Sequence, residues 1–276
     1  MQLLIPATLF TLMFALGLGL RGEAVALLRR RPALFARVLL GTCVLVPLAA
    51  LLLLRSPLLE SLSVPARLAI ALMAVSPSAP LTLRKAGRQG GDRELAAAAA
   101  VVTIPLLADL FRAVFDLSGW DIQPLPVARQ VLLVQGVPLA LGVLVRRTLP
   151  RLAETLEGPL DRAANLLLLL LTTVILVRSW PLLQAFLAAN LPGIGCIALM
   201  VLLALAIGWL LSGPGLQERT TVAVVTSTRN PGLALLFAST HAADVSGLKL
   251  AILVYVLVTL LLSLPFLRLH RWLVPA

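Results

Sequence analysis

The sequence contains few charged residues, few aromatic residues and very little polar surface. Charged residues make up 13% of the 276 positions and aromatic residues 5%, whereas hydrophobic residues reach 60%, with a mean hydropathy of +1.02. A soluble domain is about half apolar and a quarter charged. This composition excludes a water-soluble globule, and we expect one helical membrane domain over residues 1–276 with lipid as its outer solvent.

Residues that carry catalytic or metal chemistry are also scarce. Cys43 and Cys196 lie inside apolar segments at a spacing that fits no metal site. His241 and His270 are expected at the membrane interface. The expected spans contain no paired carboxylates, no Ser-His-Asp set and no metal-ligand spacing, so we predict neither an enzyme nor a cofactor.

The net charge of +11 does not indicate a nucleic-acid partner. Basic residues stand at the ends of apolar runs with few aromatic residues among them, which is typical of helix ends anchored at a membrane surface. We expect no signal peptide, because the first apolar run begins at Leu3 and is followed by Arg21 rather than a small-residue cleavage site.

A helix needs about 20 residues to cross the hydrocarbon layer. We expect about nine such spans, with one span and a loop around Asn190 and Pro192 within the uncharged segment 179–216. The intervals are 2–20, 35–54, 65–90, 93–115, 127–147, 160–178, 191–212, 217–242 and 246–268.

The basic residues are distributed unevenly between the two ends of these spans. Sixteen fall on the side of the odd-numbered loops and the C-terminus, six fall on the other side, and the remaining one of the 23, Arg229, lies near mid-depth of its span. The positive-inside rule then places the N-terminus outside and the C-terminus in the cytoplasm of the inner (plasma) membrane.

Two of the expected spans contain helix breakers near mid-depth. The third reads Ser76-Pro77-Ser78-Ala79-Pro80, and the eighth reads Thr226-Ser227-Thr228-Arg229-Asn230-Pro231-Gly232. Proline removes a backbone donor and favours the first turn of a new helix. Unwound backbone at this depth is tolerated where it lines a cavity, and broken helices of opposite direction indicate an inverted-repeat transporter with its site between the breaks. A simple proline kink is the alternative for either span alone.

Three segments resemble the sodium/bile acid symporter family: 14–20, 76–92 and 229–234. The resemblance covers nearly the whole chain. It implies a nine-helix form with two crossing discontinuous helices (spans 3 and 8), a core and a panel domain, and inverted repeats over about 1–120 and 125–276. Its helix-break residues would be Pro77, Pro80, Pro231 and Gly232.

The sequence departs from this family where the resemblance places sodium ligands. Sodium needs a shell of oxygen ligands, and leucine, alanine and valine side chains offer none. The ligand positions that look lost are Thr42, Leu83, Ala96, Ala100 and Val225, while Thr82 retains a hydroxyl and Arg229 replaces a glutamine.

Arg229 lies about 12 residues into its span, roughly 18 Å along the helix and near the midplane. An ionisable residue there costs about 2.5–3.5 kcal/mol on insertion scales. Snorkelling of the side chain to the interface is more favourable near a helix end than at this depth. A salt bridge from Arg229 to Asp109 is the other structural interpretation, but Arg112, one turn beyond Asp109, is the better-placed partner of that acid. The remaining interpretation is a guanidinium that stands in for sodium and attracts an anion.

The sequence therefore predicts a secondary transporter that moves a small organic anion, a carboxylate or sulfonate, without sodium. A sodium-coupled symporter with a non-standard ion site, or a sensor that keeps a transporter fold without transporting, remain open alternatives. The expected partners are this anion, the lipid bilayer and, as an open alternative, a second copy of the chain. The expected substrate-binding residues are Ser78, Thr82, Thr226, Thr228, Arg229 and Asn230.

Overall fold

The structure is a computed structural model that describes residues 4–19, 32–56, 62–76, 132–240 and 242–273. Every regular element in these ranges is a helix, and no strand occurs in them. The elements are α1 (Leu4–Leu18), α3 (Pro32–Leu39), η1 (Leu40–Leu45), α4 (Val46–Leu54), α5 (Val64–Val75), η4 (Leu132–Gly136), α9 (Val137–Thr148), α10 (Pro150–Arg178), α11 (Trp180–Ala189), α12 (Leu191–Leu211), α13 (Leu216–Ser227), α14 (Pro231–Thr240) and α15 (Leu248–Leu273).

Three of the described helices are long and apolar enough to cross a membrane: Ala36–Leu54, α10 and α12. Their outer faces carry fully exposed leucines, for example Leu52, Leu166 and Leu210. Exposed aliphatic side chains on such long apolar helices are expected where lipid replaces water. These helices, with no strand among the described residues, confirm the prediction of an all-helical membrane protein. Each expected span contains a described helix except 93–115, which lies outside the described residues.

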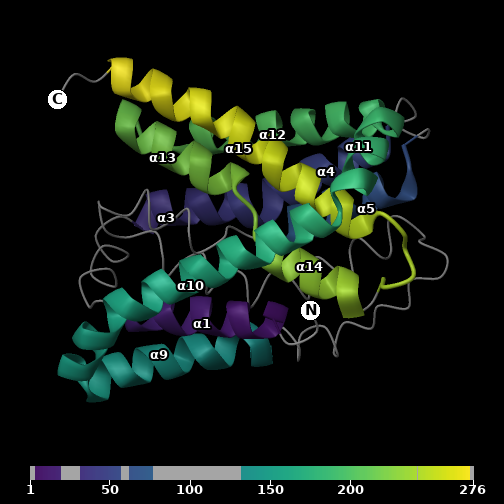
Figure 1. Ribbon diagram of the computed structural model, residues 1–276. Helices are drawn as coiled ribbons and strands as arrows, with labels where there is room; N and C mark the ends of the chain where they lie inside the picture. Colours follow the sequence, from purple (N-terminus) through teal and green to yellow (C-terminus); the bar gives the residue numbers. More distant parts are fainter. Residues whose placement is uncertain (1–3, 20–31, 57–61, 77–131, 241, 274–276) are drawn as a thin grey trace.

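A small helix group consists of α1, α9 and α10, which lie together in the lower part of Figure 1. Two glycines determine how closely the backbones of α1 and α9 approach each other. A Cβ on Gly17 would come within 2.4 Å of the Leu139 carbonyl oxygen, and one on Gly142 within 2.4 Å of the Phe14 carbonyl oxygen. Small residues let helix backbones approach closely in membranes, so these two glycines define the α1–α9 contact.

A large helix group consists of α3, η1, α4, α5, α12, α13 and α15, and it holds most of the buried apolar side chains. Helix α14 extends from this group towards α1 (Figure 1). The Leu9 side chain of α1 lies against Gly232 in the first turn of α14. The start of α14 is therefore where the two helix groups meet.

The segment before α12 differs from the sequence-based expectation. A loop was expected around Asn190 and Pro192, but residues 180–189 form the helix α11 and only Asn190 separates it from α12. Pro181 and Pro192 each stand in the first turn of a helix, where a missing N–H costs nothing. The Asn190 side chain donates to the Phe186 carbonyl oxygen at 3.0 Å. These three residues turn the chain within a single position.

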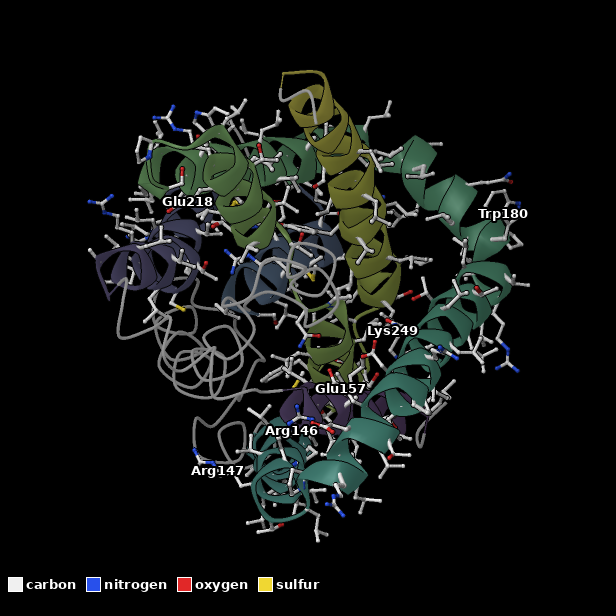
Figure 2. All side chains as sticks on the ribbon, turned by 90° about the vertical axis from the view of Figure 1, so that its left-hand side faces the viewer. Arg146, Arg147, Glu157, Trp180, Glu218 and Lys249 are labelled. Atoms are coloured by element: carbon white, nitrogen blue, oxygen red, sulfur yellow. The ribbon has the colours of Figure 1, made fainter. Side chains whose placement is uncertain are left out.

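Helix α10 also begins earlier than expected, at Pro150 rather than near residue 160. Its additional turns are polar and pair with the end of α9. Arg146 Nη1 lies 3.5 Å from Glu157 Oε2 and Arg146 Nη2 lies 3.9 Å from Glu154 Oε1. Figure 2 shows Arg146 and Glu157 close together where α9 and α10 join. These polar residues lie at the end of the helix pair, away from the apolar length of α10.

Candidate functional site

The eighth expected span is interrupted. Helix α13 ends at Ser227, residues 228–230 are not helical, and α14 begins at Pro231. Thr228 is extended, with φ −81° and ψ 122°. Asn230 caps the new helix, because its Oδ1 accepts a hydrogen bond from the Leu233 N–H at 3.1 Å. Proline at the first helical position and asparagine at the N-cap explain locally why the helix restarts here.

The break contacts the end of α5. The backbone N–H of Asn230 donates to the carbonyl oxygen of Ser76 at 3.2 Å. Ser76 is the residue after the last helical position of α5, with φ −97° and ψ 89°, and it is fully buried. The two segments singled out in the sequence thus touch through their backbones at Ser76 and Asn230.

Most of the first break lies outside the described residues. The predicted break residues Pro77 and Pro80, the predicted binding residues Ser78 and Thr82, and the predicted ligand positions Leu83, Ala96 and Ala100 all fall within 77–131. Ser76 is the last described residue before them.

Arg229 lies in the second break with only 2% of its surface exposed. Its Nη1 donates to the carbonyl oxygen of Thr42 at 3.0 Å, which joins the break to the second expected span. The Nε and Nη2 atoms of Arg229 have no hydrogen-bond partner in the part of the chain that the structure describes. The guanidinium is therefore held at one end and unpaired along one edge.

A π-helical turn explains why the Thr42 carbonyl is available. The N–H of Val46 bonds to the Gly41 carbonyl, one residue further back than in an α-helix. The partner of the Thr42 carbonyl in this pattern would be residue 47, which is proline and has no N–H. The Thr42 carbonyl therefore has no backbone N–H partner in this π-turn and can accept the hydrogen bond from Arg229. π-turns of this kind are frequent at functional sites.

The hydroxyl groups around the break fall into two classes. Thr228, Ser227 and Ser76 donate to carbonyls of their own helices, at 2.8, 3.0 and 2.7 Å. Such local bonds are usual for Ser and Thr in membrane helices. By contrast, Thr226 Oγ1 and Thr42 Oγ1 are buried and have no partner among the described residues.

Tyr255 on α15 was not among the residues selected from the sequence. Its side chain is fully buried, and its hydroxyl has no hydrogen-bond partner in the described ranges. Helix α15, which carries Tyr255, packs against both halves of the broken span, α13 and α14, and Tyr255 interacts electrostatically with Arg229. Tyr255 therefore lies on an element that borders the break. Its one available signal was that it is the only tyrosine in the chain, in an otherwise apolar span.

Close helix packing holds the N-terminal half of the broken span. A Cβ on Gly208 of α12 would lie 2.6 Å from Ala223 Cα and 2.8 Å from Thr226 Cβ. Thr226 also faces η1, since its Cγ2 would lie 3.9 Å from a Cβ placed on Gly41. Helix α13 is therefore fixed between α12 and η1, which positions Thr226 and the break that follows it.

Comparison with known proteins identifies the family of the chain. The model of the sodium bile acid symporter family matches residues 6–207, well over half of the chain. The chain belongs to the sodium bile acid symporter family. No curated protein matches the sequence. The resemblance noted in the sequence is thereby confirmed at the level of the family.

The family match ends before the second broken span of this symporter-family chain. Residues 208–276, with Arg229 and Tyr255, lie beyond the matched region. The role of this part in the site depends on the structure, which brings Arg229 to Thr42 and Asn230 to Ser76. Thr42 and Ser76 both lie within the matched region.

Proposed function

We propose that this protein is a secondary transporter that moves a small organic anion across the membrane by alternating access, without sodium. The observation that carries the proposal is the position of Arg229, buried in the broken span with its Nη1 on the Thr42 carbonyl oxygen. Membership of the symporter family supports transport as the activity. The buried, partly unpaired guanidinium supports an anion as the cargo.

The same contact supports the loss of sodium coupling. Thr42, Val225 and Arg229 stand where the family resemblance places oxygen ligands, and Arg229 bonds to Thr42 while Val225 lies one helical turn before it. Arginine stays protonated in proteins. A permanent positive charge at this point disfavours a sodium ion, and Val225 contributes no side-chain oxygen to hold one.

The start of α14 adds to the attraction for an anion. The first N–H groups of a helix are unpaired and carry the positive end of the helix dipole. Asn230 satisfies one of these donors through its side-chain oxygen. Ser78 and Thr82 follow Ser76 by two and six positions, so we propose that they complete the site from the other broken span.

The arrangement of the helices fits a rocking mechanism. We propose that the small group of α1, α9 and α10 is the panel domain and that the large group is the core domain, within nine spans formed by two inverted repeats. The junction of α9 and α10 and the start of α15 lie at opposite ends of the helices (Figure 1), and the first carries Arg146 and Arg147 whereas the second carries Lys249. This fits an N-terminus outside the plasma membrane and a cytoplasmic C-terminus.

Counterflow in proteoliposomes tests the function directly. We expect liposomes preloaded with unlabelled acetate or benzoate to accumulate the labelled anion, with equal initial rates in sodium and in choline buffer. Arg229→Gln should abolish the accumulation. Arg178→Gln, which removes an exposed arginine at the end of α10, should leave it intact.

Each alternative predicts a different result in this assay. A rate that collapses when choline replaces sodium would show sodium coupling through a non-standard site. Anion-dependent thermal stabilisation without any counterflow would favour a sensor. Counterflow that survives Arg229→Gln at the full rate would refute the role given to this arginine.

A further inference from the structure

The unpaired edge of Arg229 has a defined shape. Nη1 is used by the Thr42 carbonyl, whereas Nε and Nη2 have no partner among the residues the structure describes. In a planar guanidinium, the N–H on Nε and one N–H on Nη2 point in the same direction. This edge matches the two oxygens of a carboxylate and supports a bidentate contact.

Further buried donors lie on the elements that border the break. Tyr255 Oη, Thr226 Oγ1 and Thr42 Oγ1 are buried and unpartnered in the described part of the chain. They come from α15, α13 and η1, three elements that are distant in the sequence. Buried polar groups are normally hydrogen-bonded, and each of these hydroxyls can donate. Among the described residues, the site therefore offers more unpaired donors than acceptors, and a bound acceptor would satisfy them.

The described chain supplies no counter-charge at this position. Its acids are Glu154, Glu157 and Asp161 on α10, Glu218 in the first turn of α13, and Asp244 before α15. Glu218 is closest in sequence, but 11 residues separate it from Arg229, or roughly 16 Å along a helix. A buried charge without a partner is strongly unfavourable, so a bound anion is the natural partner of this guanidinium.

We infer that the site is a carboxylate subsite, in which the Nε–Nη2 edge of Arg229 binds both carboxylate oxygens and the Tyr255 hydroxyl donates to one of them. The inference rests on the proposed function and narrows its substrate to carboxylates. A sulfonate is a weaker hydrogen-bond acceptor than a carboxylate, so it should bind this edge less tightly. A neutral amide lacks the charge and is excluded.

Thermal unfolding of the full chain in lipid nanodiscs tests the subsite. The probes are acetate, methanesulfonate, acetamide and chloride, compared at equal ionic strength in zwitterionic buffer. Acetate should raise the unfolding temperature more than methanesulfonate or chloride, and acetamide should not raise it. Tyr255→Phe and Arg229→Lys should each weaken the apparent acetate affinity by about tenfold or more, because each removes a hydrogen bond to a charged group.

Thr259→Val is the matched control. Thr259 lies one turn from Tyr255, is equally inaccessible, and already donates to the Tyr255 carbonyl oxygen at 2.8 Å. The Thr259→Val variant should bind acetate with the same affinity as the unmodified protein. Tyr255→Phe removes an unpaired buried hydroxyl, so its unfolding temperature without anion should be unchanged or higher, which separates a binding defect from a folding defect.

The outcomes separate this inference from the proposed function. Equal stabilisation by acetate and chloride, or an unchanged acetate affinity in Tyr255→Phe, would overturn the carboxylate subsite even where counterflow shows transport. A loss of acetate affinity in Tyr255→Phe and Arg229→Lys, with Thr259→Val unaffected, would support the subsite even where counterflow fails and transport is rejected.

Discussion

The backbone N–H of Asn230 donates to the carbonyl oxygen of Ser76 across 3.2 Å, and this bond joins the end of α5 to the gap between α13 and α14. The same residue caps α14 through its side chain. Asn230 therefore hydrogen-bonds to the end of α5 through its backbone and to the start of α14 through its side chain. Each of these helix ends would otherwise leave backbone groups without partners inside the membrane, which is costly.

Asn230→Ala should destabilise the protein by about 1 kcal/mol, the usual value for loss of an N-cap. Asn230→Ser should retain most of the stability, because serine is also a good N-cap residue. The measurement is the free energy of unfolding in mixed micelles. Asn190→Ala is the control, because the Asn190 side chain donates to Phe186 and makes no cap bond to α12. A larger loss at Asn190 than at Asn230 would contradict the capping role.

The break at 228–230 could be predicted because its causes are local. Pro231 and Asn230 are signals that act on the residues next to them, and the structure interrupts the helix between Ser227 and Pro231. The expected loop around Asn190 and Pro192 was wrong in extent, because Pro192 stands in the first turn of α12 and only Asn190 separates α12 from α11. Proline marks the edge of a helix, but the residue pattern alone does not say on which side the helix lies.

The partner of Arg229 could not be predicted in the same way. The acceptor is the Thr42 backbone carbonyl, which every residue type would offer, so no side chain marks it. The usable signal was Pro47, five positions later, which removes the N–H that the carbonyl would need in a π-turn. Tyr255 could not be assigned to the site from the sequence, because its position depends on how α15 packs against α13 and α14, which a single sequence does not reveal.

Gly142→Ala should separate α1 from α9. A Cβ at this position would lie 2.4 Å from the Phe14 carbonyl oxygen, and backbone cannot move aside as a flexible side chain can. Overpacking of this kind costs about 1–3 kcal/mol. Gly158→Ala on α10 is the control, because nothing lies within 4 Å of its Cβ position.

The control substitution should be neutral or slightly stabilising, since alanine is the better helix former by up to about 1 kcal/mol. Thermal unfolding of both variants in nanodiscs measures the difference. Equal stability of Gly142→Ala and Gly158→Ala would show that the α1–α9 contact is looser than the structure indicates.

Pro47→Ala should weaken anion binding without unfolding the protein. The new N–H at residue 47 can bond to the Thr42 or Cys43 carbonyl, so it competes with Arg229 Nη1 for Thr42. We expect the apparent acetate affinity to fall by about tenfold. The measurement is the acetate-dependent shift in unfolding temperature.

Pro138→Ala is the matched control for this substitution. The π-turn η4 is followed by the same Val-Pro pair, but the residue equivalent to Thr42 is Leu133, whose side chain is exposed. Removal of Pro138 should therefore leave acetate binding unchanged. Similar losses in both variants would mean that the prolines act on helix stability in general and not on the Thr42 carbonyl.

Arg229→Met should remove the dependence of stability on anions. In buffer with little free anion, the unmodified protein buries a guanidinium whose Nε and Nη2 lack partners among the described residues. Replacing a poorly compensated buried charge with an apolar side chain of similar length is often stabilising, by about 1–4 kcal/mol. The loss of one hydrogen bond to the Thr42 carbonyl, worth roughly 1.5–3 kcal/mol for a charged donor, offsets part of this gain. We expect a small net rise in the unfolding temperature.

Acetate should then stabilise the unmodified protein and leave Arg229→Met unaffected. Ligand stabilisation grows as the logarithm of concentration above the dissociation constant, so the two titration curves should cross as acetate is added. Arg178→Met should follow the unmodified protein throughout, because this exposed arginine lies at the end of α10. Parallel curves for Arg229→Met and the unmodified protein would mean that acetate acts elsewhere, since a ligand of the guanidinium must lose its effect when the guanidinium is removed.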